Sequence, residues 1–143
     1  MNRPMLLLMV AAASGCGIEE PLAPETNMYL GIIQYTGHPQ ADPVHWQAPD
    51  SAPVGQEIAV SVTTWGIGCP QVGVTQVTVE GSTVVIEPFD DYGEVRCASA
   101  TLISLEHIAR FSIPITGEAT IQVIGLRAPK RKVIRVERTL LVY

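Results

Sequence analysis

The feature that most constrains this chain is a strict alternation of apolar and polar residues over short segments. Between residues 56 and 65, Ile58, Val60 and Val62 are separated by small or polar residues. A period of two residues is typical of a β-strand with one buried face. No segment keeps the 3.6-residue apolar period of an amphipathic helix over ten residues. The pattern therefore predicts an all-β protein.

Turn residues divide the rest of the chain into similar short segments. Gly81-Ser82 is a favourable hairpin turn between two apolar runs. A second hairpin is expected at residues 127–131, with Pro129 in its loop. Residues 101–107 fit either a strand or one helical turn. The other predicted strands are residues 28–35, 44–47, 72–80, 83–87, 109–115, 119–126 and 132–142.

Seven to eight short strands predict a sandwich or a barrel. An immunoglobulin-like β-sandwich is the first expectation, and a small β-barrel is the alternative. The resemblance is architectural, because Cys69 and Cys97 are only 28 residues apart and Val95 occupies the place of the tyrosine that precedes the second cysteine in antibody domains. The 143 residues suffice for one domain. With 47% hydrophobic and 16% charged residues, the chain is expected to be globular.

The N-terminus has the layout of an export signal. Arg3 is followed by an uncharged apolar run over residues 5–13, which is too short to span a bilayer as a helix. The sequence Ala13-Ser14-Gly15-Cys16 then resembles the lipobox of bacterial lipoproteins, with Ala13 where leucine is most usual. The resemblance covers the first sixteen residues. It implies cleavage before Cys16 and a diacylglyceryl group on the Cys16 sulfur.

This resemblance sets the expected organisation of the chain. Residues 1–15 are the signal peptide, residues 16–27 are the lipidated cysteine with an acidic, proline-bearing flexible tether, and residues 28–143 are the β-sandwich. A lipoprotein cysteine bears at least two acyl chains, which is enough for stable anchoring. Gly17 follows the cysteine, which by resemblance to enterobacterial sorting favours the outer membrane. The alternative is a soluble secreted or periplasmic protein cleaved after Ala13 or Gly15.

Once Cys16 is lipidated, Cys69 and Cys97 remain as an even pair. Exported proteins fold where disulfides persist, so we expect these two to be joined. In the chain-entropy model a loop of 28 residues gives roughly 3.5 kcal/mol of stability. A metal site made of both cysteines and His107 is disfavoured, because no close pair of ligands is present. We expect neither a metal nor another cofactor.

A cluster of acidic residues, Asp90, Asp91 and Glu94, surrounds a glycine. A solvated turn is the favoured interpretation, and coordination of calcium or contact with a saccharide is the alternative. Trp46, which lies between two prolines, is the better candidate of the two tryptophans for an exposed ligand contact.

The basic residues are unevenly placed. Six of the nine lie between residues 127 and 138, in a chain of net charge −5. An acidic chain is a poor binder of nucleic acid. The group Arg127, Lys130, Arg131 and Lys132 is expected to form a solvated edge hairpin, where cations prevent edge-to-edge pairing. The functional alternative is contact with anionic lipid or an acidic envelope protein, since an immunoglobulin-like topology places this hairpin near the anchor.

No motif indicates catalysis. His38, His45 and His107 are isolated, and no G-x-S-x-G elbow is present. The sequence therefore favours a non-catalytic envelope lipoprotein whose tethered sandwich serves protein interaction or envelope structure. The alternatives are a small-ligand or carbohydrate-binding module and an exported hydrolase.

Overall fold

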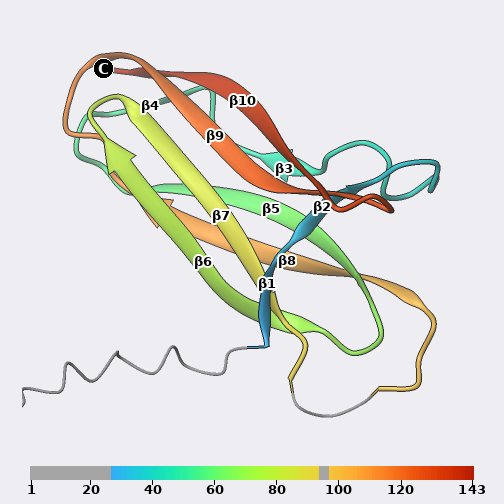
Figure 1. Ribbon diagram of the computed structural model, residues 1–143. Helices are drawn as coiled ribbons and strands as arrows, with labels where there is room; N and C mark the ends of the chain where they lie inside the picture. Colours follow the sequence, from blue (N-terminus) through green and yellow to red (C-terminus); the bar gives the residue numbers. More distant parts are fainter. Residues whose placement is uncertain (1–26, 94–96) are drawn as a thin grey trace, which may run out of the picture.

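The computed structural model describes residues 27–93 and 97–143 (Figure 1). Within these residues every regular element is a β-strand, which confirms the all-β prediction. The strands are β1 Met28–Leu30, β2 Ile32–Tyr35, β3 Trp46–Gln47, β4 Ser51–Ala52, β5 Ile58–Ile67, β6 Gln71–Glu80, β7 Thr83–Asp91, β8 Leu102–Phe111, β9 Gly117–Ala128 and β10 Lys132–Val142.

The strands form two layers that are joined by hydrogen bonds. One layer is ordered β6-β7-β9-β10-β4, and the other is ordered β8-β5-β3. Strand β2 connects them, because it pairs with β9 in the first layer and with β5 in the second. The sheet is open, so the β-sandwich is confirmed over the barrel (Figure 1).

The direction of strand pairing distinguishes this sandwich from an immunoglobulin domain. Three ladders are parallel, namely β7 with β9, β2 with β9 and β10 with β4, whereas immunoglobulin sheets are antiparallel. The described residues contain ten strands, where seven to eight were expected. The extra elements are short, since β1, β3 and β4 contain two or three residues each.

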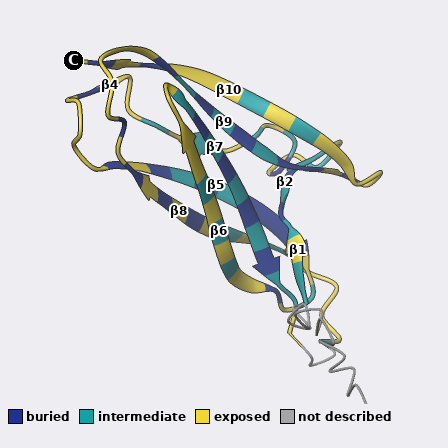
Figure 2. Cartoon of the chain, turned by 60° about the vertical axis from the view of Figure 1, so that its left-hand side comes forward, coloured by how far each residue is buried: buried dark blue, intermediate teal, exposed yellow. Residues whose placement is uncertain are grey.

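The core lies between the two layers and consists mainly of β-branched residues. Along β5, Ile58, Val60 and Val62 are all at most 3% exposed, as the alternation predicts. Val84 and Ile86 of β7 face them from the other layer and are fully buried. Figure 2 shows the resulting alternation, with buried and intermediate positions along β7 and intermediate and exposed positions along the outer strand β6.

Both predicted hairpins are confirmed. Gly81 has the positive φ of 61° that the tight turn between β6 and β7 requires. Strands β9 and β10 pair without interruption from Lys132 opposite Arg127 to Val142 opposite Gly117, with Pro129 in the loop. This loop and the start of β1 lie at the end of the sandwich away from the C-terminus (Figure 1).

Several predicted segments differ from the observed strands. The predicted strand at residues 28–35 is broken at Gly31, where the chain leaves its pairing with β7 and crosses to β9 and β5. Of residues 101–107, left open between strand and helix, residues 102–107 belong to strand β8. Their ladder with β5 fixes the strand conformation. The strand predicted at residues 109–115 is the end of the same strand, which stops at Phe111.

Candidate functional site

A polar cluster is buried between the layers. The His107 Nε2 of β8 lies 2.8 Å from the Asp90 Oδ1 of β7, and the Thr64 hydroxyl of β5 donates to the same oxygen over 2.7 Å. The Nδ1 of His107 shares a 2.9 Å hydrogen bond with the Thr75 hydroxyl of β6. The cluster therefore links four strands of both layers.

The order hydroxyl, imidazole, carboxylate matches that of a nucleophilic triad. However, His107 is 0% and Asp90 1% exposed, so a solute has no access to either group. The second carboxylate oxygen of Asp90 is buried without a hydrogen-bond partner among the described residues. The arrangement is an internal hydrogen-bonded network that joins the two layers.

The interpretation of the acidic residues as a solvated turn is therefore wrong for Asp90. Strand β7 extends to Asp91, and the alternation of the strand turns Asp90 toward the core. Asp91 does form the turn, where its carboxylate accepts the N–H of Gly93 over 2.8 Å. Glu94 lies outside the described residues.

A hollow of about 660 Å³ opens at the end of the sandwich where β1 begins. This volume is within the range of small-ligand sites. Three of the four tyrosines of the chain line it, and we name it the tyrosine pocket. Its lining residues are Tyr29, Ile32, Tyr35, Ile67, Tyr92, Ala128, Pro129 and Arg131.

The register of β1 against β7 builds the aromatic wall. Tyr29 is directly opposite Asp90, which makes Tyr92 its diagonal neighbour. The two rings meet edge to face, with centroids 5.8 Å apart and planes inclined by 76°. The Tyr92 N–H donates to the Asn27 carbonyl over 3.0 Å, which ties the entering chain to this wall.

The environment of Tyr92 favours its neutral phenol. Burial raises the pKa of Tyr92, and the carboxylate of Asp90 raises it further. The guanidinium of Arg131 acts in the opposite direction and lowers this pKa. The pocket therefore presents an uncharged hydroxyl close to a cation at physiological pH.

A second hollow of about 320 Å³ lies on the same hairpin loop. Thr36, Arg127, Lys130 and Lys132 line it together with Ala128 and Pro129, and we name it the cationic pocket. The two pockets share Ala128 and Pro129. The predicted basic group is therefore divided, with Arg131 in the tyrosine pocket and the other three cations in the cationic pocket.

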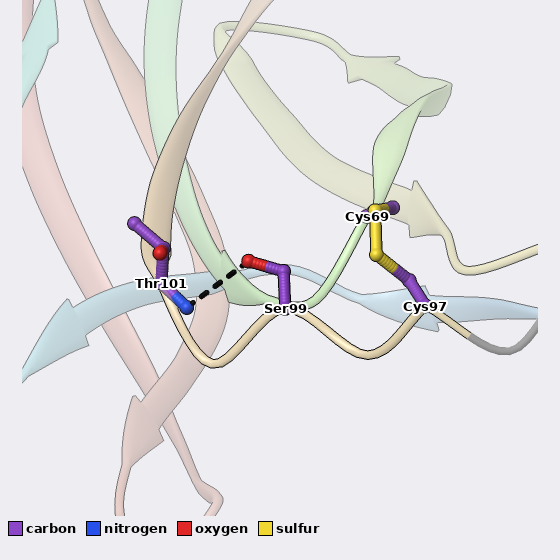
Figure 3. Close-up of a disulfide and its surroundings, with 4 residues drawn as sticks. All are labelled: Cys69, Cys97, Ser99 and Thr101. Atoms are coloured by element: carbon purple, nitrogen blue, oxygen red, sulfur yellow. Dashed lines mark hydrogen bonds between the residues drawn. A yellow bond between two sulfur atoms is a disulfide. The ribbon is translucent and has the colours of Figure 1, made fainter.

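The predicted disulfide is present. Cys69 and Cys97 are bonded, with their Cα atoms 5.6 Å apart (Figure 3). The bond connects the loop after β5 to the segment before β8, where the Ser99 hydroxyl accepts the N–H of Thr101 over 3.3 Å. Among residues 27–93 and 97–143, no group of three metal-ligating side chains is found.

Trp46 is not the exposed aromatic that its flanking prolines suggest. Its ring is half-buried against the core, and the Arg138 guanidinium lies 5.3 Å from its centroid. The other tryptophan, Trp65, is buried. The predicted lipidation site, Cys16, lies outside the described residues. In the part of the chain that the structure describes, no helix has the length and hydropathy needed to span a membrane.

Comparison with known proteins identifies no family for this chain. No protein-family model, curated protein or solved structure matches the chain. The case for a function therefore depends on the geometry of the two pockets.

The tyrosine pocket was not predicted from the sequence. Its aromatic residues come from positions 29, 35 and 92, and they meet only through the pairing of β1 with β7 and of β2 with β9. The only local signal is Tyr92, which lies inside the acidic segment that the sequence marked as a possible ligand contact.

Proposed function

We propose that this chain is an exported, lipid-anchored, non-catalytic binding domain of the bacterial cell envelope, and that the tyrosine pocket is its ligand site. The observation behind the proposal is an open hollow of about 660 Å³ with three tyrosines and one arginine in its lining. The Cys69–Cys97 disulfide supports export. The burial of Asp90 and His107 supports a role in binding rather than acid–base chemistry.

The lining favours a small saccharide. A tyrosine ring offers a flat apolar face together with a hydroxyl. A pyranose is complementary, since it has C–H faces and a rim of hydroxyls. Tyr29 is 50% exposed, and its ring stands nearly perpendicular to that of Tyr92, so the two rings form a corner open to solvent. Arg131 is placed to pair with the carboxylate of an acidic sugar.

A titration with saccharides tests the ligand. Hexoses, N-acetylhexosamines and uronic acids are added to the full chain while its amide resonances are followed by NMR. At least one sugar is expected to shift the resonances of residues 29, 35 and 92. Tyr29→Ala removes one ring of the corner and is expected to weaken binding about tenfold, in line with the magnitude of aromatic contacts.

The fourth tyrosine supplies the control. Tyr143 is 64% exposed and lies at the C-terminal end, away from the pocket. Tyr143→Ala is expected to leave binding unchanged. The ligand assignment fails if no sugar shifts the pocket resonances, or if the two alanine variants bind equally.

Protein binding is the second candidate function, and one observation favours it. Ile67, Val72 and Val74 are each about half exposed on the two sides of the loop that contains Cys69. An aliphatic surface of this kind suits an envelope protein better than a sugar. Cross-linking in intact cells, followed by mass spectrometry, would identify such a partner, and Val74→Lys is expected to abolish the cross-link.

A further inference from the structure

Two like charges face each other on the β9–β10 hairpin. Arg127 and Lys132 are directly opposite in the antiparallel register, so their side chains leave the sheet on the same face. Like charges in this arrangement destabilise a hairpin. Within residues 27–93 and 97–143 neither cation forms an ion pair. The pair therefore adds no ion-pair stabilisation to the hairpin, and its role in folding is limited to preventing edge-to-edge pairing.

Farther from the loop, the ladder of β9 with β10 contains a favourable polar pair. Gln122 and Glu137 are also directly opposite each other, and the Gln122 amide donates to the Glu137 carboxylate over 2.9 Å. The repulsive pair occurs at the loop end of the hairpin, where Lys130 adds a third cation. Local conflicts of this kind are typical of functional sites.

Three cationic residues line the hollow, and parts of its wall are held in place by hydrogen bonds. The Arg127 Nε donates to the Gln34 side-chain oxygen over 2.7 Å, which fixes one side of the guanidinium. The Thr36 N–H donates to the Ala128 carbonyl over 3.0 Å and fixes the threonine beside the loop. The nearest acidic residue on the loop after β2, Asp42, accepts from the Gln34 amide and the Gly37 N–H.

We propose that the cationic pocket binds a phosphate ester. Two lysines and one arginine around a threonine provide the charge and the hydrogen-bond donors that phosphate oxygens accept. The ester has two possible sources, the headgroup of an anionic phospholipid or a soluble phosphate monoester. The chain enters β1 at this end of the sandwich, which favours the lipid when Cys16 is the anchor. The site does not require a ligand in the tyrosine pocket.

The test uses the full chain with Cys16→Ala, which removes the acyl acceptor and leaves every other residue in place. One arm measures co-sedimentation with phosphatidylglycerol vesicles and with phosphatidylcholine vesicles at low salt. The other arm follows the amide resonances of residues 127–132 by NMR during titration with glycerol 3-phosphate and with glycerol. Each variant is made in this background, so any contribution of the N-terminal residues is common to all.

The double variant Lys130→Gln/Lys132→Gln is expected to lower affinity for the anionic vesicles. A lysine near an anionic surface contributes about fivefold, so the pair predicts a loss of roughly 30-fold. Arg135→Gln is the control. It changes an exposed cation on the same strand whose partner, Ile124, places it on the opposite face of the hairpin. Its effect is expected to be less than threefold.

The outcomes separate the two sources. If the double variant loses affinity for phosphatidylglycerol vesicles, the site binds a lipid headgroup. If it loses affinity only for glycerol 3-phosphate, the site binds a soluble ester. Binding in neither arm, or equal losses in the double variant and in Arg135→Gln, overturns the proposal. None of these results depends on sugar binding in the tyrosine pocket, so the two proposals fail separately.

Discussion

A buried carboxylate is stable only when groups inside the fold meet its charge. Asp90 receives a hydrogen bond from Thr64 and the imidazole of His107, and both acidic and basic partners are almost completely buried. Removing the partner of a buried polar group costs about 1–3 kcal/mol, because the group loses its hydrogen bond and gains no contact with water. His107→Leu is expected to lower the free energy of unfolding by this amount, as measured by urea denaturation.

Two further variants separate charge from packing at this cluster. Thr75→Val removes only the hydroxyl that meets the second imidazole nitrogen and is expected to cost about 1 kcal/mol. Asp90→Leu/His107→Leu removes both buried polar groups and is expected to be less destabilising than His107→Leu alone. Equal losses for His107→Leu and Thr75→Val would contradict the view that the contact between His107 and Asp90 is the more stabilising of the two.

Tyr92 makes a residue-scale prediction for alkaline pH. Its pKa is raised above 10.0, first by burial and then by Asp90, so the folded state binds the phenolic proton more tightly than the unfolded chain. The associated stability is fully present below pH 10.0 and is lost as the pH rises through the folded pKa. Ultraviolet titration of the tyrosines is expected to show a phenol that ionises above pH 10.0, and this step is expected to be absent in Tyr92→Phe.

The charged neighbours of Tyr92 act in opposite directions. Asp90→Asn removes a carboxylate and lowers this pKa, whereas Arg131→Gln removes a cation and raises it. Burial is the largest cause of the raised pKa, so neither substitution alone returns the pKa of Tyr92 to its ordinary value. A shift in the same direction for both variants would contradict this account.

At the scale of elements, Gly31 allows the chain to change partners between β1 and β2. Its N–H donates to Pro88 of β7 over 2.8 Å, and its carbonyl accepts from Leu126 of β9 over 2.8 Å. A Cβ at this position would overlap the methyl group of Thr64 and lie 3.2 Å from the unpaired oxygen of Asp90. The glycine is therefore required by close approach of the two layers.

Gly31→Ala is expected to destabilise the fold by about 1–3 kcal/mol through overpacking. Thr64→Ser deletes the obstructing methyl group and keeps the hydroxyl that donates to Asp90. Thermal denaturation should therefore show a higher melting temperature for Gly31→Ala/Thr64→Ser than for Gly31→Ala. A double variant no more stable than the single one would locate the strain elsewhere.

What the sequence predicts at this scale is local. The alternation in β5 and the glycine turn between β6 and β7 involve neighbouring residues, so both elements follow from the pattern. The parallel pairing of β7 with β9 joins segments about 37 residues apart, from Thr83 opposite Thr120, and no local pattern encodes it. The alternation of β7 places Asp90 on the buried face, but its contacts with Thr64 and His107 join segments that are distant in the chain, and no local pattern encodes them.

The whole molecule has an unequal distribution of charge and aromatic surface. The chain is acidic overall, at −5, yet the hairpin loop has four cations next to three tyrosines. Tyrosines and cations together are characteristic of surfaces that face a membrane interface. The twelve residues from 16 to 27 reach about 40 Å at most when fully extended, so an anchor at Cys16 keeps this end near the bilayer.

This geometry predicts an orientation on the membrane. In lipid nanodiscs that contain phosphatidylglycerol and a spin-labelled headgroup, the host-purified protein is expected to lose NMR intensity more strongly at residues 130–132 than at Gly81 and Tyr143. The reason is that the hairpin loop and the chain entry share one end of the sandwich, while the Gly81 turn and the C-terminus share the other (Figure 1).

Added salt should reduce this difference in NMR intensity between the two ends. At physiological ionic strength, charges more than about 8 Å apart are already largely screened from each other. Cys16→Ala should leave the membrane fraction when the salt concentration is also raised, because only the screened contact of the hairpin then remains. Equal attenuation at both ends would mean that the tether alone, without the hairpin, holds the domain at the surface.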